Sequence, residues 1–277
     1  EYRKRPGSFI MFIFVHLATL ITVLSIGFLL VYVLVKGIPN LNADIFSWEY
    51  TSDNCSLVPA LINTVYMTLL SLLIAGPIGI FAAIYLVEYA KTGNKLVGVV
   101  RITAETLTGI PSIVYGLFGM LFFTNACGLR LSLISGALTL AIMVLPVIMR
   151  TTEEALMAVP KSYREGSFGL GAGKLRTVFK VVLPSAVPGI LSGIILATGR
   201  IVGETAALIY TAGSVAKMAT KLTDSTRTLA VHMYLLSKEG LHTDQGYATA
   251  VVLLVLVVLI NFASDKIAGK VAADKAN

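Results

Sequence analysis

The sequence has little charge. Aspartate, glutamate, lysine and arginine make up 13% of its 277 residues, whereas 56% are hydrophobic. A soluble globular domain carries about 25% charged residues. This composition predicts an integral membrane protein. The net charge of +7 then reflects membrane topology rather than nucleic-acid binding, for which the sequence carries no motif.

The sequence also lacks the common catalytic motifs. It contains no Gly-x-x-x-x-Gly-Lys-Ser/Thr loop, which excludes ATP hydrolysis by the usual phosphate-binding arrangement, and no His-Glu-x-x-His. No Cys/His spacing indicates a metal site, so we expect no metal and no cofactor in this chain. Cys55 and Cys127 both fall in expected outer segments, where a disulfide and two independent thiols both remain open.

Long hydrophobic stretches predict an all-α integral membrane protein with about six transmembrane helices. The first stretch is too long for a signal peptide and is expected to be retained. Most lysines and arginines fall on one side of these spans, which places both termini in the cytoplasm. The expected spans are residues 9–36, 60–87, 102–126, 132–151, 185–212 and 246–264.

Three regions follow from this pattern. Residues 1–59 comprise a basic stub, the first span and an outer loop. Residues 60–264 form the main transmembrane domain, which includes a cytoplasmic loop at 152–183. Residues 265–277 form a cytoplasmic tail.

The third span carries polar residues and a break. Arg101 and Glu105 are four apart and are expected to pair on one helix face. Thr108 to Ser112 (TGIPS) then interrupts the helix, since Pro111 removes a backbone donor. Broken membrane helices occur where they are buried in protein or line a cavity, so Thr108 and Ser112 are pathway candidates. A simple packing kink is the alternative.

The fifth span contains Arg200 and Glu204 near its middle. An arginine at the centre of a spanning helix costs about 2.5–3.5 kcal/mol on insertion scales, so it needs a partner or water. Glu204, one turn on, is expected to supply one. The two residues either fix helix packing as an internal ion pair or line an anion pathway. Close helix packing is expected at four glycines, Gly189, Gly193, Gly199 and Gly203.

Two other arginines leave alternatives open. Arg150 ends the fourth span, where an arginine either anchors the helix in the headgroups or faces the pathway. Arg227 lies in the outer segment 213–246, where it either guides anions toward a pore or is simply solvated. In that segment, Leu229 to Leu236 could form an amphipathic helix at the membrane interface.

The longest polar interruption, Arg150 to Pro184, is rich in basic residues and therefore belongs in the cytoplasm. Ser162 to Glu165 can open a short helix there, and the glycines at 169, 171 and 173 can end it. This segment is either an ordinary connection or a docking device for a cytoplasmic partner.

From Glu165 this loop reads E-G-S, three residues, Gly, nine residues, Val, one residue, Leu-Pro. The spacing resembles the signature of ABC-importer permeases, in which Glu-Ala-Ala opens the pattern and Ile replaces the valine. The resemblance implies a type I ABC importer permease fold and a loop that inserts into an ATP-hydrolysing subunit. The implied coupling residues are Glu165, Gly166, Ser167, Gly171, Leu183 and Pro184.

Three further stretches, GIPSIVYGLFG, LPVIMRTTEEAL and TGRIVGETAAL, resemble the A-type subunit of the phosphate-specific branch of this family. The resemblance covers roughly residues 60–262. It implies that Arg150 and Arg200 lie on a phosphate pathway in a prokaryotic cell membrane. It also implies a second permease, two ATPase subunits that bind ATP and magnesium, and an extracytoplasmic phosphate-binding protein. Transport of another oxyanion such as sulfate, or secondary anion transport, remains the alternative.

Overall fold

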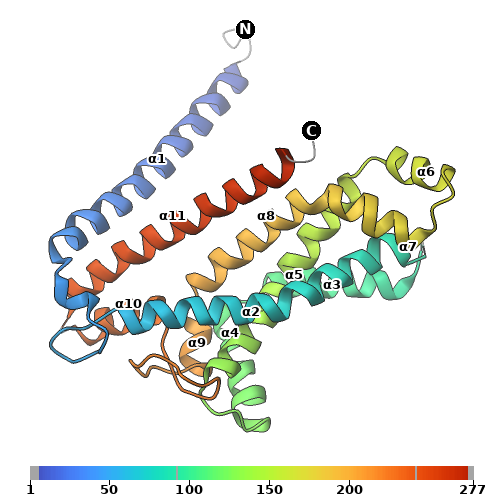
Figure 1. Ribbon diagram of the computed structural model, residues 1–277. Coiled ribbons are helices and arrows are strands. Elements are labelled where there is room, and N and C mark those ends of the chain that lie inside the picture. Colours follow the sequence, from blue (N-terminus) through green and yellow to red (C-terminus); the bar gives the residue numbers. More distant parts are fainter. Residues whose placement is uncertain (1–5, 92, 241, 274–277) are drawn as a thin grey trace.

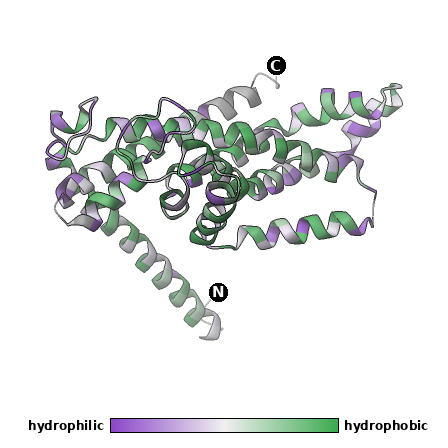
Figure 2. Cartoon of the chain, turned by 90° about the horizontal axis from the view of Figure 1, so that it is seen from below, coloured by the Kyte–Doolittle hydropathy of each residue, from purple (hydrophilic) through white to green (hydrophobic). Residues whose placement is uncertain are grey.

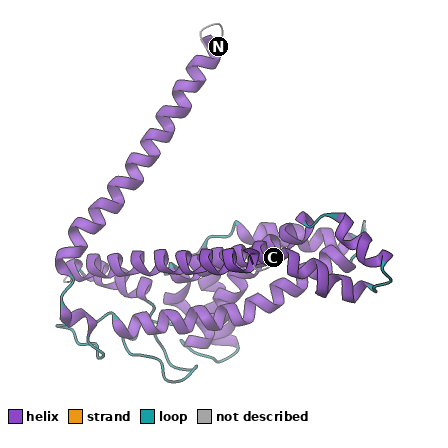
Figure 3. Ribbon diagram, turned by 45° about the horizontal axis from the view of Figure 1, so that its top comes forward, coloured by secondary structure: helices purple, strands orange, loops and turns teal. Residues whose placement is uncertain are grey.

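The computed structural model describes residues 6–91, 93–240 and 242–273, and within these ranges it contains helices and loops but no strand (Figure 1 and Figure 3). Parts of the expected basic stub (1–5) and tail (274–277) lie outside the described residues. The α-helices are α1 (Pro6–Gly37), α2 (Val58–Ile84), α3 (Lys95–Thr108), α4 (Ser112–Gly119), α5 (Leu133–Ala158), α6 (Lys161–Gly169), α7 (Lys174–Thr177), α8 (Leu183–Val202), α9 (Ala206–Thr211), α10 (Leu229–Glu239) and α11 (Thr243–Ala273).

Shorter helical segments extend or connect these elements. Wider π-helical turns continue α2 over Tyr85–Tyr89, α4 over Met120–Ala126 and α7 over Val178–Val182. Two 3₁₀ turns, Ile38–Asn40 and Ala43–Phe46, follow α1 in the outer loop.

The helices confirm the expected membrane spans. Among the described residues, five helices are long and apolar enough to cross a membrane, and a bent pair, α3 with the segment from Ser112 to Ala126, brings the number to six. Hydrophobic residues follow the long helices, whereas hydrophilic residues gather in the loops and at helix ends (Figure 2). The chain is therefore a multi-pass membrane protein.

Helix α1 stands apart from the other helices. None of its most apolar 18-residue stretch is buried, and it diverges from the helical body (Figure 3). Its C-terminal end is held against α11, because a Cβ atom at Gly37 would collide with the backbone carbonyl of Tyr247. Most of α1 thus faces lipid or another subunit.

Helix α5 lies at the centre of the body, packed between α2 and α8. It runs parallel to α2, since Gly79 of α2 faces Ile148, and antiparallel to α8, since Gly193 faces Thr151 and Gly189 faces Ala155. The expectation of close packing is confirmed at Gly189 and Gly193, where a Cβ atom would overlap α5. At Gly199, by contrast, a Cβ atom would meet nothing within 4 Å.

Two spans are interrupted. The break between α3 and α4 was expected, and the helices there bend by 105°. The fifth span was expected to be continuous, but α8 ends at Val202 and α9 begins at Ala206. The short helices that follow the two breaks, α4 and α9, lie side by side. A Cβ atom at Gly116 of α4 would come within 2.8 Å of the Ala207 Cα of α9.

Candidate functional site

Arg200 lies in the last turn of α8, next to the break that precedes α9. Its side chain is partly exposed, and among the described residues its guanidinium forms no hydrogen bond or ion pair. It lies close enough to Tyr115 on α4 for its charge to influence the phenol, which places it near the broken third span. An arginine in this position has donors available for an anion.

The expected pairing of Arg200 with Glu204 is wrong. Helix α8 has already ended when the chain reaches Glu204, so the two residues do not share one helical face. The Glu204 side chain is buried, and its Oε1 accepts a hydrogen bond from the Ala207 backbone N–H at 3.0 Å. Glu204 therefore caps the first turn of α9 and fixes the break, while Arg200 keeps its charge uncompensated.

The break in the third span lies at the same depth as the break in the fifth. Gly116 faces Ala207 and Gly119 faces Thr211, so α4 and α9 run parallel, and the start of α4, one turn before Gly116, lies close to the break that precedes α9. Ser112 opens α4, so the positive end of the α4 dipole points to this level. Helix termini of this kind favour negatively charged ligands.

Two hydroxyl groups help to hold the bent backbone. The Tyr115 hydroxyl donates a 2.7 Å hydrogen bond to the Leu107 carbonyl, which also accepts the Ile110 backbone N–H at 3.2 Å. Thr108 is exposed, and its Oγ1 donates to the Ala104 carbonyl at 2.9 Å, which shields a second carbonyl of the last turn of α3. These two hydroxyl groups thus stabilise the bent backbone at the expected break.

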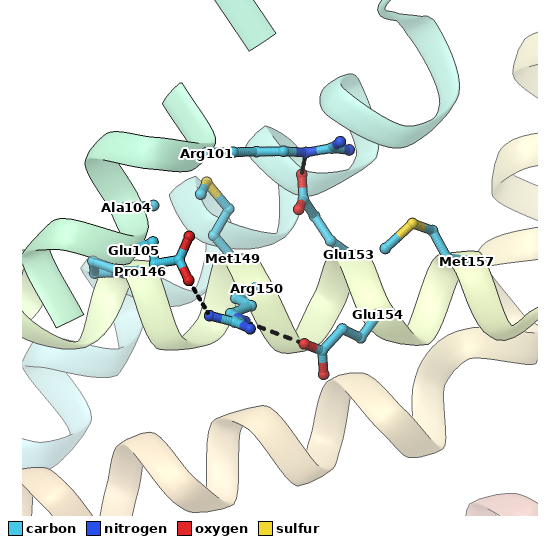
Figure 4. Close-up of a pocket in the computed structure, with 9 residues that line it drawn as sticks. All are labelled: Arg101, Ala104, Glu105, Pro146, Met149, Arg150, Glu153, Glu154 and Met157. Atoms are coloured by element: carbon cyan, nitrogen blue, oxygen red, sulfur yellow. Dashed lines mark hydrogen bonds and ion pairs between the residues drawn. The ribbon is translucent and has the colours of Figure 1, made fainter. Parts of the chain in front are cut away.

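Arg150 lies further along α5, toward the end that leads to α6, and has two acidic neighbours (Figure 4). Its Nε donates to Glu154 Oε1 at 3.2 Å, and its Nη1 lies 3.8 Å from Glu105 Oε1. These groups line a cavity of about 260 Å³ between α3 and α5. The expected pair of Arg101 with Glu105 is wrong.

Arg101 instead reaches across to Glu153 on α5, with Nε 3.4 Å from Oε1. The Glu153 side chain is only 8% exposed, so this carboxylate needs the cross-helix partner more than exposed Glu105 does. Two ion-pair links, from Arg101 and Arg150, therefore join α3 to α5 below the break.

The depths of Arg200 and Arg150 follow from helix packing. In the antiparallel register of α5 and α8, Arg200 is level with Val144, which precedes Arg150 by six residues. At 1.5 Å per residue the two guanidinium-bearing positions are about 9 Å apart along the helix axes. They mark two successive levels along the helical body.

The expected cytoplasmic loop contains a short helix, α6, and this expectation is confirmed. Glu165 and Gly166 are exposed on it, whereas the Ser167 hydroxyl lies 2.9 Å from the buried Thr177 hydroxyl of α7. Gly171, just after α6, has φ +81°, a left-handed conformation that favours glycine. Leu183 and Pro184 begin α8.

Arg164 ties α6 to the membrane helices, a role that sequence reasoning missed. Its Nε and Nη2 donate to Glu88 Oε1, at 3.0 and 2.6 Å, in the π-helical turn that ends the second span. Its Nη1 and Nη2 also donate to the carbonyls of Val159 and Leu156, at 2.9 Å each, in the last turn of α5. The sequence did show Glu88 as a lone acid at the end of an apolar span, but not which cation would meet it.

The far side of α6 presents apolar side chains to the surroundings. Leu170 is 91% exposed, and Phe168 and Tyr163 are about half exposed. Exposed hydrophobic groups rimmed by polar residues are typical of a protein interaction surface. Figure 1 shows α6 projecting from the end of the helical body.

At the opposite end, the alternative of a solvated Arg227 is wrong, because the residue is only 6% exposed. The helix expected near it exists as α10, but Leu229, Val231 and His232 are buried in the protein rather than held at a membrane interface. Cys55 and Cys127 do not form a disulfide.

Comparisons with known proteins agree with this architecture. The chain matches the model of the binding-protein-dependent transport system inner membrane component family over residues 75–273. It is 33% identical over 270 residues to the probable ABC transporter permease protein YqgI of Bacillus subtilis, covering 89% of this chain and 90% of that protein. It is 35% identical over 211 residues to the phosphate transport system permease protein PstA 1 of Mycobacterium tuberculosis, covering 75% and 69%.

Solved structures show the same fold. A subunit of the methionine ABC transporter MetNI, in an inward-facing conformation, superimposes with a TM-score of 0.60 at 25% identity, covering 76% of this chain and 93% of that one. A subunit of a bacterial alginate ABC transporter gives a TM-score of 0.68 at 15% identity, covering 96% and 98%. The chain has the type I ABC importer permease fold and belongs to the family of binding-protein-dependent transport system inner membrane components.

Proposed function

We propose that this chain is a permease subunit of an ATP-driven importer of inorganic phosphate. Relatives named as phosphate transport permeases, at 35% identity over three quarters of the chain, support the substrate. In this proposal a second permease completes the pathway, two ATPase subunits bind ATP and magnesium, and an extracytoplasmic protein delivers phosphate. Both termini and α6 lie in the cytoplasm, as the distribution of basic residues favours.

The observation that carries the proposal is the guanidinium of Arg200. Within the part of the chain that the structure describes it forms no hydrogen bond or ion pair, and it lies beside the break between α8 and α9 and near the positively polarised start of α4. A guanidinium offers planar paired donors that match the oxygens of phosphate. Because Glu204 is occupied in capping α9, it does not neutralise Arg200, and a passing phosphate can.

Arg150 provides a second contact, about 9 Å further toward the cytoplasm. Here Glu105 and Glu154 already share the guanidinium, so phosphate must compete with two carboxylates. Both carboxylates and Arg150 are more than half exposed, so solvent weakens these ion pairs and exchange is easy. The phosphate is therefore held weakly at this level, which favours release into the cytoplasm.

In this proposal the partner ATPase acts on the permease through α6. Glu165 to Gly171 and the exposed Leu170 form the contact with the ATPase, which moves α6 as it closes and opens. Arg164 transmits this movement, since it joins α6 to Glu88 of the second span and to the end of α5. A bound phosphate by itself sets no direction, so the ATP cycle must bias the outward-open and inward-open states.

Uptake of labelled phosphate into cells without other phosphate importers tests the proposal. We expect Arg200→Gln to assemble with its partners but to lose at least about tenfold in transport, and Arg200→Lys to retain part of it, because lysine keeps the charge but not the planar fork. Arg130→Gln, which changes an exposed outer arginine, is the matched control. Excess sulfate should not compete with phosphate in the wild type.

Two outcomes would contradict the proposal. Normal uptake by assembled Arg200→Gln would make Arg200 a packing residue. Uptake that responds to sulfate and not to phosphate would assign the chain to another oxyanion, while the role of α6 could stand.

A further inference from the structure

A second cationic centre lies at the outer end of the chain, away from the proposed pathway residues. Arg227 immediately precedes α10, and His232 lies in its first turns. Arg227 is 6% exposed and His232 is 0% exposed. Tyr50, from the outer loop after α1, contacts both: its ring lies 4.5 Å from the guanidinium and 6.0 Å from the imidazole, in an edge-on arrangement.

One edge of the Arg227 guanidinium has no protein partner. Nε and Nη2 are both buried, and neither donates a hydrogen bond within the described residues. These two nitrogens form the side-on fork, whose N–H bonds point the same way. In Arg164 the same two nitrogens donate to the Glu88 carboxylate at 3.0 and 2.6 Å. This edge of a guanidinium therefore binds a negatively charged group elsewhere in the same chain.

No carboxylate balances the Arg227 charge. Among the described residues no aspartate or glutamate forms an ion pair with it, and the nearby Glu49 and Asp53 are exposed. Asp224, three residues earlier, is occupied by the backbone N–H groups of Thr220 and Lys221. A buried charge without an ionic partner is unfavourable, and the Tyr50 ring offsets only part of that cost, so a counter-ion from outside the chain would stabilise Arg227.

Two more buried polar atoms belong to the same region. Thr228 Oγ1 and His232 Nδ1 have no partner, and the two residues are four apart, on one face at the start of the 11-residue α10. The Thr228 side chain does not cap the helix, so the positive end of its dipole faces this point as well. The Thr228 hydroxyl can donate to an anion and the start of the helix favours negative charge, whereas His232 Nδ1 can donate only when it is protonated.

We propose that Arg227, Thr228 and His232 bind one small inorganic anion of halide size at the start of α10. The Nε–Nη2 fork of Arg227 and the Thr228 hydroxyl donate to the anion, while Tyr50 covers the face of the guanidinium. A halide fits better than a tetrahedral oxyanion or a partner's carboxylate, because the three anion-binding residues are almost completely buried by the chain itself. The anion holds the outer loop around Tyr50 against α10.

His232 takes part as an adaptable donor. Its Nε2 lies 3.3 Å from the Cys55 carbonyl, which can only accept, so Nε2 carries a proton. Burial and the neighbouring Arg227 charge lower the pKa of His232 to about 3 when no anion is considered, so Nδ1 is then unprotonated. An anion at Nδ1 stabilises the doubly protonated ring, so anion binding is linked to proton uptake.

Thermal unfolding of the purified complete transporter tests this site without measuring transport. The assay uses the Arg200→Gln background, which removes the proposed phosphate contact. Sodium chloride or sodium phosphate replaces sodium gluconate at constant ionic strength. We expect chloride to raise Tm saturably by about 2–4 °C, and phosphate to do less. Adding Arg227→Gln should abolish the rise, and Arg227→Lys should weaken it.

The proposal is overturned if chloride raises Tm equally with and without Arg227→Gln, or if chloride has no saturable effect in the Arg200→Gln background. A larger effect of phosphate would assign the site to an oxyanion instead and refute the halide assignment. If the Arg227→Gln variant does not assemble, replacing chloride with bromide in the wild-type transporter tests the site instead. Crystals of the wild-type transporter in bromide should give an anomalous peak within hydrogen-bonding distance of Arg227 Nη2, and a water molecule without such a peak would refute the site.

Discussion

The contact between Arg164 and Glu88 makes the sharpest prediction about energy coupling. The two side chains are 19% and 8% exposed, and the guanidinium satisfies one carboxylate and two helix-terminal carbonyls. Removing one member of a buried ion pair leaves an uncompensated charge and costs about 3–5 kcal/mol. Arg164→Met should therefore lower the free energy of unfolding by about that amount, because Glu88 remains buried and charged.

The double variant separates stability from transmission. Replacing both charges, in Arg164→Met/Glu88→Leu, removes the buried carboxylate and should recover stability to within about 1 kcal/mol of wild type. It should not recover coupling, because neither apolar side chain bonds α6 to the end of α5. We expect phosphate-stimulated ATP hydrolysis of the reconstituted transporter to stay low while basal hydrolysis persists.

Unfolding in mixed detergent micelles and ATPase activity in proteoliposomes measure the two quantities. Lys161→Met, on the same helix and exposed, is the matched control and should change neither. The reasoning fails if Arg164→Met costs less than about 1 kcal/mol. The transmission role fails if the double variant couples ATP hydrolysis to transport as the wild type does.

Three further predictions follow from single contacts. Gly193→Ala should destabilise by about 1–3 kcal/mol, because its Cβ would collide with Thr151, whereas Gly199→Ala should be near neutral, and detergent unfolding of both variants checks this. Leu170→Asp should abolish co-purification of the ATPase while the permease pair still assembles, and retention of the ATPase would refute α6 as the docking contact. Because the pKa of His232 is lowered from 6.5 to about 3, the unfolded chain binds more protons than the folded one between these values, so in gluconate stability should fall as pH drops through this window. His232→Gln should remove this slope, and an unchanged slope in that variant would refute the assignment.

The sequence predicted the short helix α6 well because its signals are local. Helix-forming residues after Pro160 and the glycines that follow them determine where α6 begins and ends. The Leu183–Pro184 dipeptide likewise marked the start of α8, since proline is tolerated in a first helical turn. The ends of a helix can be predicted from such patterns without knowing which other helices pack against it.

Side-chain partners were predicted poorly, because they are chosen across elements. Spacing of four residues suggested Arg101 with Glu105, but the packing of α3 on α5 brings the buried Glu153 to Arg101. The same spacing suggested Arg200 with Glu204, but the helix ends between them. A helical-spacing rule holds only while the helix continues, and where it ends depends on the tertiary contacts of α9.

Composition, hydrophobic length and the distribution of basic residues by themselves determined that this is a membrane protein with about six spans, because a bilayer imposes those requirements on any chain that crosses it. Only the tertiary structure decided which charges are neutralised. Among the residues it describes, it gave Arg200 no ion-pair partner near the two breaks, placed Arg164 on Glu88, and buried Arg227 under Tyr50. The physical reason is that charge compensation acts over a few ångströms, and residues far apart in the sequence reach that distance only when the helices have packed.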